Sequence, residues 1–229
     1  MIKIHDRDVR GKTKTGWLDS HHTYSFGYFR DPQRMGFRSL RVMNDDVVIP
    51  GAGFATHGHA NMEIVTVVLD GALAHKDSLG TGSTIRPGEI QRMTAGSGIE
   101  HSEFNASNDN SVHLLQIWIL PEEKNLQPGY EQITAPDGKG FVLVGDRHGT
   151  GGAVTIHQDV KMSLAKLKAG EAATYALEKG RGAFLQLARG QATLNGALLK
   201  EGDGAEIEDV STIELVADAD SEALLIDMK

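Results

Sequence analysis

Short segments of alternating apolar and polar residues run through most of this chain, and most end at glycine or another turn-forming residue. Turn signals recur about every 8–12 residues, a spacing typical of β-sandwiches and barrels. No long amphipathic helical pattern is present, and residues 122–126 are expected to form one helical turn at most. The pattern therefore predicts an all-β protein, with strands over residues 39–42, 63–69, 72–76, 90–94, 112–119, 141–144, 154–158, 161–167, 183–188, 191–194, 205–207, 212–216 and 223–228.

The strand pattern is interrupted once, over residues 121–136. This segment, PEEKNLQPGYEQITAP, contains three prolines and little periodicity, as linkers do. It predicts an N-terminal domain of residues 1–130 and a C-terminal domain of residues 131–229. The two parts share a weak internal repeat, which predicts two related β-domains. The turns that carry this repeat are Asp70-Gly71 with Arg86-Pro87-Gly88-Glu89 in the first part, and Arg189-Gly190 with Lys200-Glu201-Gly202-Asp203 in the second.

The composition and the apolar runs of the chain indicate in which cellular compartment to expect the protein. The 229 residues are enough to bury a sizeable core, and the absence of cysteine excludes disulfides and thiolate ligands. The N-terminal segment MIKIHDRDVR has no apolar core of the kind that a signal peptide needs. The longest apolar run, residues 112–120, is too short to span a bilayer. We therefore expect a cytoplasmic protein with no membrane contact.

The charge of the chain narrows the choice of partners. A formal net charge of −8 argues against binding to the nucleic-acid backbone as the main activity. The first 41 residues are basic, with nine Lys or Arg and four Asp or Glu. These charges are spaced singly between apolar residues, which is typical of the solvent-facing side of a sheet. A basic binding surface near the N-terminus is the alternative interpretation.

Two short segments, His57-Gly58-His59 and His101-Ser102-Glu103, contain the candidate chemistry. Side chains at positions i and i+2 of a strand point to the same face. On neighbouring strands, the two segments would direct three imidazoles and one carboxylate at a single point. A nitrogen and oxygen ligand set without sulfur suits Fe(II), Mn, Cu, Ni, Co or Zn better than Ca or Mg.

A single His-x-His pair is more often a pair of ordinary surface or core histidines than a metal site. Here each segment follows two closely spaced glycines, Gly51 and Gly53 or Gly96 and Gly98, which favours the metal site. Glu63 is a rival carboxylate, because it would share the face of His59 on an unbroken strand. The remaining histidines have no partner at ligand spacing and are expected to be ordinary: His5, His21, His22, His75, His113, His148 and His157.

The internal repeat indicates that only the first part carries this chemistry. When the two parts are aligned on their turns, His57 corresponds to Ala176 and His101 to Leu215. The C-terminal domain is therefore predicted to lack the metal ligands and to be a structural partner with an empty barrel.

At these residues the chain resembles a known family. GAGFATHGHANME and GEIQRMTAGSGIEHSEFN are similar to the two cupin motifs, and both look like those of pirin, a bicupin family. The similarity is dense over residues 16–132 and weak over the C-terminal half. Further matching residues include Trp17, Asp19-Ser20, His22-Thr23, Ser25-Phe26, Asp31-Pro32, Met35-Gly36-Phe37, Leu40-Arg41-Val42, Asn44-Asp45-Asp46 and Gln116-Ile117-Trp118.

The resemblance implies two tandem cupin jelly-roll barrels that face each other, with one divalent metal in the N-terminal barrel. Family ligands occupy the positions of His57, His59, His101 and Glu103, which favours Glu103 over Glu63 and leaves Glu63 to orient an imidazole. Iron, as Fe(II), is the usual metal, and Mn, Cu, Ni, Co or Zn is tolerated. One departure is Gly58, where the family commonly has proline.

The resemblance also implies a function. Bacterial pirins cleave quercetin with O2, so we expect a quercetin 2,3-dioxygenase. It would act on a flavonol-like aromatic substrate and release CO and a depside. We also expect the protein to be a monomer. Glu103 is the expected catalytic residue, because it can accept the proton of a substrate hydroxyl. The alternative function is that of a non-catalytic, metal-dependent regulatory protein, which would bind a protein partner through the basic N-terminal surface.

Overall fold

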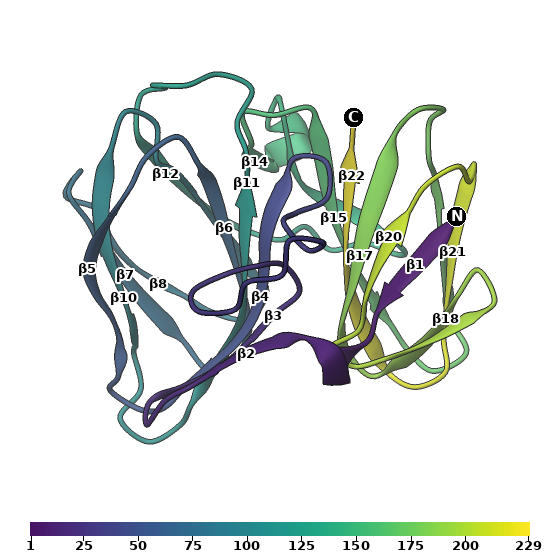
Figure 1. The fold of residues 1–229 in the computed structure, drawn as a ribbon, viewed down its shortest axis with the longest axis horizontal. Coiled ribbons are helices and arrows are strands. Elements are labelled where there is room, and N and C mark those ends of the chain that lie inside the picture. The colour runs from purple at the N-terminus through teal and green to yellow at the C-terminus, as the bar shows by residue number, and fades with distance from the viewer.

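The computed structural model describes residues 1–229 and contains 22 strands, which confirms the all-β prediction. The only helices are two 3₁₀ turns, η1 (Arg7–Val9) and η2 (Thr150–Gly152). No helix is both long enough and apolar enough to cross a membrane. The strands form two barrels, each built from a sheet of seven strands and a sheet of four (Figure 1).

The first barrel is formed mainly by the N-terminal half of the chain. The strand order of its larger sheet is β12 (Gly129–Thr134), β9 (Glu89–Thr94), β6 (Glu63–Asp70), β11 (Val112–Ile119), β4 (Leu40–Val48), β3 (Leu18–His22) and β2 (Gly11–Lys14). The strand order of its smaller sheet is β5 (Gly53–His59), β10 (Ile99–Asn105), β7 (Leu73–Asp77) and β8 (Gly82–Ile85).

The second barrel repeats this plan, which confirms the internal repeat. Its larger sheet has the order β1 (Ile2–His5), β20 (Gly204–Ile207), β17 (Gly182–Arg189), β22 (Ser221–Met228), β15 (Val160–Leu167), β13 (Val142–Asp146) and β14 (Val154–Thr155). The smaller sheet consists of β16 (Ala172–Ala176), β21 (Thr212–Ala217), β18 (Gln191–Leu194) and β19 (Ala197–Lys200). The N-terminal strand β1 thus lies in the second barrel, as its purple colour among green and yellow strands shows (Figure 1).

Every strand that the alternation predicts has a counterpart in the structure, although several boundaries shift. Nine further strands lie outside the predicted ranges. Two of them, β5 and β10, carry the histidine segments, and the other seven are only four to six residues long: β1, β2, β3, β8, β12, β16 and β19. The expected linker over residues 121–136 is irregular only up to residue 128 and then continues as β12, which pairs with β9. The helical turn expected at residues 122–126 is instead a bend.

The two barrels face each other through their larger sheets (Figure 1). A cluster of 20 buried apolar residues fills the space between these sheets, with contributions such as Leu115 and Ile117 from β11 and Leu224 and Ile226 from β22. Burial of apolar surface on this scale is the dominant favourable term in association. The contact between the barrels is therefore a hydrophobic core of its own.

The interiors of the two barrels differ. A cluster of 17 buried apolar residues fills the second barrel, so the expectation of an empty barrel is wrong. In the first barrel, two smaller apolar clusters are separated along the strands by polar residues. On β6, for example, Thr66 lies between Ile64 of one cluster and Val68 of the other. The polar layer between these clusters contains the candidate site.

Strand register also corrects the alignment of the repeat. Glu103 pairs with His75, four residues after Gly71, and Leu215 pairs with Leu194, four residues after Gly190. Leu215 is therefore the counterpart of Glu103, not of His101. By the same register, the counterparts of His101 and His57 are Ile213 and Tyr175, because each pair is matched across its own smaller sheet.

We expect Phe184→Ala in the core between the barrels to lower the free energy of unfolding by about 3–5 kcal/mol, the usual cost of truncating a buried aromatic residue. Phe184 is fully buried there and packs against Tyr24, with ring centroids 5.9 Å apart. The measurement is urea unfolding of the full chain. Leu198→Ala is the control, because Leu198 is 51% exposed and should change stability by about 0.5 kcal/mol at most. Equal losses in both variants would contradict this account of the core.

Candidate functional site

The two histidine segments lie on neighbouring antiparallel strands, as expected. His57 on β5 is directly opposite His101 on β10, and His59 lies on the same face as His57. Ring centroids are 4.5 Å apart for His57 and His101, 4.9 Å for His59 and His101, and 4.8 Å for His57 and His59. One nitrogen of each ring lies within 4.8 Å of the others, so the three imidazoles converge on one point.

Glycine allows the two strands to approach closely at this point. A Cβ atom on Gly53 would lie 2.2 Å from the backbone oxygen of Glu103 and 2.5 Å from the Cα of Phe104. No side chain larger than hydrogen fits there without moving the backbone. The strand register shifts between His101 and Glu103, which marks a β-bulge next to the site.

The imidazoles are suited to bind a metal ion. Burial, together with the neighbouring imidazoles, lowers the pKa of His59 to about 4 and that of His101 to about 3, so both rings are neutral at pH 7. His57 donates its Nδ1 hydrogen to the backbone oxygen of Ala55, 2.8 Å away, which leaves Nε2 as a lone-pair donor. Both nitrogens of His101 are buried and lack a hydrogen-bond partner. A metal ion would satisfy a buried nitrogen of this kind.

Glu103 is buried beside the imidazoles, and its carboxylate is held by two residues of the larger sheet. Thr66 donates its hydroxyl hydrogen to Gln116 Oε1 at 3.1 Å, which turns Gln116 Nε2 towards Glu103 Oε2 at 3.0 Å. The other oxygen, Oε1, is buried without a partner. Burial raises the pKa of Glu103 to about 7, although the hydrogen bond from Gln116 opposes this rise.

Glu63, the rival carboxylate, points away from the three imidazoles. The chain turns between β5 and β6, where Asn61 has a φ of 53°, so the unbroken strand that would align Glu63 with His59 does not exist. Glu63 instead contacts Thr94 at 3.1 Å and His157 at 3.3 Å. The imidazole that it contacts is thus His157, from the C-terminal half, and not one of the site histidines.

His75, which the sequence suggests is ordinary, lies directly behind the site on β7. One nitrogen each of His75 and His101 and an oxygen of Glu103 lie within 4.8 Å of one another. His75 Nε2 is 3.0 Å from Asp77, its ring packs on Tyr130, and its Nδ1 is buried without a partner. The His-x-Asp spacing of His75 and Asp77, on a strand next to β10, is the sequence signal that could have identified it.

A row of polar side chains crosses the inner face of the larger sheet, with one residue on each of five adjacent strands. In strand order these are His22 on β3, Asn44 on β4, Gln116 on β11, Thr66 on β6 and Gln91 on β9. We call these five residues the polar row. The sequence signal for part of the row is a polar residue within an apolar run, as with Gln116 on β11 and Thr66 on β6.

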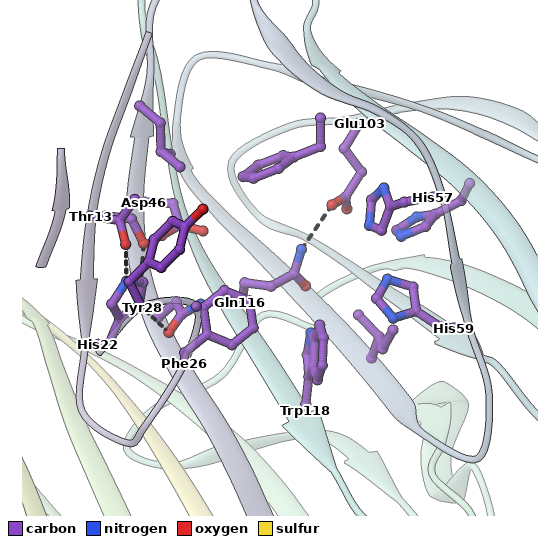
Figure 2. Close-up of a pocket in the computed structure, with 17 residues that line it drawn as sticks. Thr13, His22, Phe26, Tyr28, Asp46, His57, His59, Glu103, Gln116 and Trp118 are labelled. Atoms are coloured by element: carbon purple, nitrogen blue, oxygen red, sulfur yellow. Dashed lines mark hydrogen bonds between the residues drawn. The ribbon is translucent and has the colours of Figure 1, made fainter. Parts of the chain in front are cut away.

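A cavity of about 230 Å³ opens beside the imidazoles (Figure 2). This volume is just below the roughly 300–1,000 Å³ of drug-sized ligand sites, so it suits one small molecule. Aromatic residues line its middle: Phe26 packs edge-on against Trp118, and Trp118 lies against His59 with ring centroids 4.9 Å apart. Tyr28, which is 96% exposed, and Phe54 complete the aromatic lining.

The side of the cavity away from the imidazoles is polar. We call it the polar wall; it consists of Thr13, Ser20, His22, Asn44 and Asp46. Asp46 is 3% exposed and accepts a short hydrogen bond from the Ser20 hydroxyl. Burial raises the pKa of Asp46 to about 7; the Ser20 hydrogen bond opposes this rise, while the charges of Asp45 and Glu103 add to it.

Comparisons with known proteins agree with this geometry. The chain matches the family model Pirin over residues 4–119 and the model of the quercetinase C-terminal cupin domain over residues 143–228. It is 43% identical to a quercetin 2,3-dioxygenase of Escherichia coli K12, covering 100% of this chain and 99% of the relative. It is 39% identical to a pirin-like protein of Caulobacter vibrioides, covering 99% of each chain.

Solved structures support the same relationship. The crystal structure of the bacterial pirin YhhW from Escherichia coli in complex with nickel(II) is 42% identical to this chain. It superposes with a TM-score of 0.95 and covers 100% of this chain and 99% of YhhW. The two-barrel architecture is therefore the bicupin fold that the sequence motifs predict.

We expect Asp46→Asn to stabilise the protein increasingly between pH 4 and pH 7. Because the pKa of Asp46 is about 7 in the folded state, against an ordinary 3.8, the contribution of this carboxyl to stability is greatest below pH 4 and is lost between pH 4 and pH 7, where the unfolded chain ionises first. Asparagine does not titrate, so the variant should exceed the wild type by a few kcal/mol at pH 8. The measurement is urea unfolding of the metal-free protein across this pH range.

Asp45→Asn provides a control of opposite sign. Burial alone would raise the pKa of Asp45, but its hydrogen bonds and charge interactions with His113 and Arg10 lower it to about 2. This carboxylate stabilises the folded state above pH 4, and the stabilisation is lost as the pH falls towards 2. The variant should therefore be less stable than the wild type near neutral pH. The same pH trend in both variants would contradict the assignment.

Proposed function

This chain belongs to the pirin family, and on that premise we propose that it is a metal-dependent dioxygenase that cleaves a flavonol such as quercetin with O2, releasing CO and a depside. One observation carries the proposal: three convergent imidazoles and a buried carboxylate lie at one end of a cavity lined by aromatic rings. Relatives named quercetin 2,3-dioxygenase support the reaction class.

His57, His59, His101 and Glu103 would hold one divalent transition metal. The nitrogen and oxygen donor set suits Fe(II), Ni, Mn, Co, Cu or Zn, and a related pirin structure contains nickel(II). When bound, the ion would polarise the substrate hydroxyl and bring O2 close to the ring. The buried, unpartnered nitrogens of His101 and the neutral ring of His59 favour these residues as ligands.

Glu103 would accept the proton of the substrate hydroxyl. A general base works best with a pKa near the operating pH. In the metal-free protein, burial raises the pKa of Glu103 to about 7. Gln116 Nε2 holds Oε2, and Oε1 has no hydrogen-bond partner within the chain, so Oε1 is the oxygen that would face the ion and the substrate hydroxyl. Gln116, itself oriented by Thr66, is thus a positioning residue for this carboxylate.

The aromatic side chains would orient the substrate and exclude water. Phe26 and Trp118 meet edge-to-face with ring centroids 5.3 Å apart, and Phe54 stands against Trp17 at 5.0 Å. Flat aromatic molecules pack well between rings held in this way. Holding the substrate in one orientation is a large source of rate enhancement in reactions between two molecules.

The alternative, a regulatory protein that binds a partner through its basic N-terminal surface, finds less support. Three arginines of this segment are paired within the chain: Arg10 with Asp45 at 2.9 Å, Arg34 with Asp31 at 3.1 Å and Arg38 with Glu208 at 2.9 Å. These pairs neutralise much of the positive charge that an acidic partner would recognise.

We expect His101→Ala to reduce bound metal from about one ion per chain to well below one, because His101 contributes to both groups of converging ligand atoms around the site. The measurement is metal content by mass spectrometry after reloading with Fe(II) or Ni(II) and desalting. His148→Ala is the control, since His148 is exposed and far along the chain from the cluster. Undiminished metal in His101→Ala would refute the ligand assignment.

Glu103→Gln should lower the rate of quercetin cleavage by about 100-fold or more, the usual contribution of a general base. Glutamine keeps an oxygen at this position, so metal content and melting temperature are measured alongside CO release. Full turnover in a metal-loaded variant would exclude Glu103 as the base. Wild-type protein that holds metal but releases no CO would favour the regulatory alternative.

A further inference from the structure

The polar wall is a built structure whose hydrogen-bond directions are fixed. Asn44 Oδ1 accepts only, so His22 donates its Nδ1 hydrogen to it at 2.8 Å. Burial lowers the pKa of His22, so the ring is neutral and Nε2 accepts a hydrogen bond from the Thr13 hydroxyl at 2.8 Å. The Ser20 hydroxyl donates to Asp46 Oδ1. The donors of Thr13, Ser20 and His22 are therefore used within the wall.

Two polar groups of the wall are left without a partner. One is the second carboxylate oxygen of Asp46, and the other is the amide nitrogen of Asn44. Asp46 and Asn44 are two residues apart on β4, so both side chains face the barrel interior, and both line the cavity. The wall thus offers the cavity one acceptor and one donor. A hydroxyl group complements this pair, because it donates one hydrogen bond and accepts another.

The polar wall and the metal-binding end belong to opposite sides of the barrel. The wall lies on β2, β3 and β4 of the larger sheet, whereas His57, His59, His101 and Glu103 lie on β5 and β10 of the smaller sheet. Gln116, on the strand next to β4, bridges to Glu103. Aromatic side chains, including Phe26 and Trp118, line the space between them (Figure 2).

We propose that Asp46, backed by Ser20 and flanked by Asn44, binds a hydroxyl group at the end of the substrate opposite to its metal-facing oxygen. The pocket then selects planar aromatic molecules that carry hydroxyl groups at both ends. This inference rests on the proposed function, since it concerns the substrate of the same site. Asp46 is a specificity-determining residue in this account, while Glu103 takes the proton.

The energetic basis is the cost of leaving a buried carboxyl unpaired. Asp46 is only 3% exposed. A ligand that fills the cavity would remove the remaining contact between this carboxyl and solvent. A ligand hydroxyl would replace that water with a hydrogen bond, whereas a C–H group in the same place would leave the carboxyl unsatisfied. Sites built to bind a hydroxyl in this way strongly reject analogues that lack it.

The test compares two ligands that share the metal-binding end. Quercetin and 3-hydroxyflavone both carry the 3-hydroxyl and 4-keto groups, but 3-hydroxyflavone lacks the other hydroxyls. Affinities are measured by calorimetry on Ni(II)-loaded protein under anaerobic conditions, so that turnover does not consume the ligand. The readout is the ratio of the two affinities, which a general weakening of the pocket would leave unchanged.

Wild-type protein should bind quercetin at least about tenfold more tightly than 3-hydroxyflavone, which is the effect expected of one hydrogen bond to a buried carboxylate. Asp46→Ala should bring the ratio close to one, and Asp46→Asn, which keeps a neutral hydrogen-bonding group, should give an intermediate ratio. Asp45→Ala is the matched control, because Asp45 precedes Asp46 on β4 and is paired with Arg10 and His113 outside the cavity. Its ratio should equal that of the wild type.

A folded Asp46→Ala variant with the wild-type ratio would overturn the inference, and so would wild-type protein without a preference for quercetin. If Asp46→Ala does not fold, an unchanged ratio in Asp46→Asn overturns it instead. CO release under air, measured separately, distinguishes the two proposals. If the protein releases CO but the affinity ratio does not change in the Asp46 variants, only this inference fails. If the affinity ratio changes in the Asp46 variants but no CO is released, only the dioxygenase proposal fails.

Discussion

The polar row across the inside of the first barrel is the constraint on which the site depends. Burying uncharged polar groups costs free energy unless each finds a hydrogen-bond partner. Here His22 bonds to Asn44, and Thr66 bonds to Gln116, which in turn holds Glu103. The second of these hydrogen-bonded chains, from Thr66 through Gln116 to Glu103, connects the larger sheet to the smaller one and fixes the position of the carboxylate. The carboxylate at its end is therefore oriented before any ligand binds.

The second barrel makes this arrangement rigid. Side chains alternate along β11, so Leu115 and Ile117 face the core between the barrels while Gln116 faces the site. The same sheet is thus packed on one face and functional on the other. The second barrel has the same strand order, but a cluster of 17 apolar residues fills it, with Ile213 and Leu215 at the positions of His101 and Glu103. Its own core supplies stability that a polar interior would not.

Sequence patterns predicted those features that are encoded locally. Alternation identified the longer strands, and the i, i+2 spacing of the histidines placed three imidazoles together because β5 and β10 are neighbours. The polar row was not predictable in this way, because His22, Asn44 and Gln116 are far apart in the chain and only strand register aligns them. Glu63 illustrates the opposite error: spacing suggested a shared face with His59, but a turn at Asn61 places it on another sheet.

Electrostatics connects the two ends of the cavity. Two buried carboxyl groups, Glu103 and Asp46, line one cavity, and no lysine or arginine is among the residues that line it. Each charge disfavours ionisation of the other, and burial raises both pKa values to about 7. A divalent cation at the imidazole end would offset this negative charge and favour the ionised form of Glu103. The same balance disfavours substrates that carry a carboxylate of their own, because a further anion would meet Asp46 without a compensating cation. A neutral, hydroxylated aromatic molecule is the ligand that this charge distribution accepts.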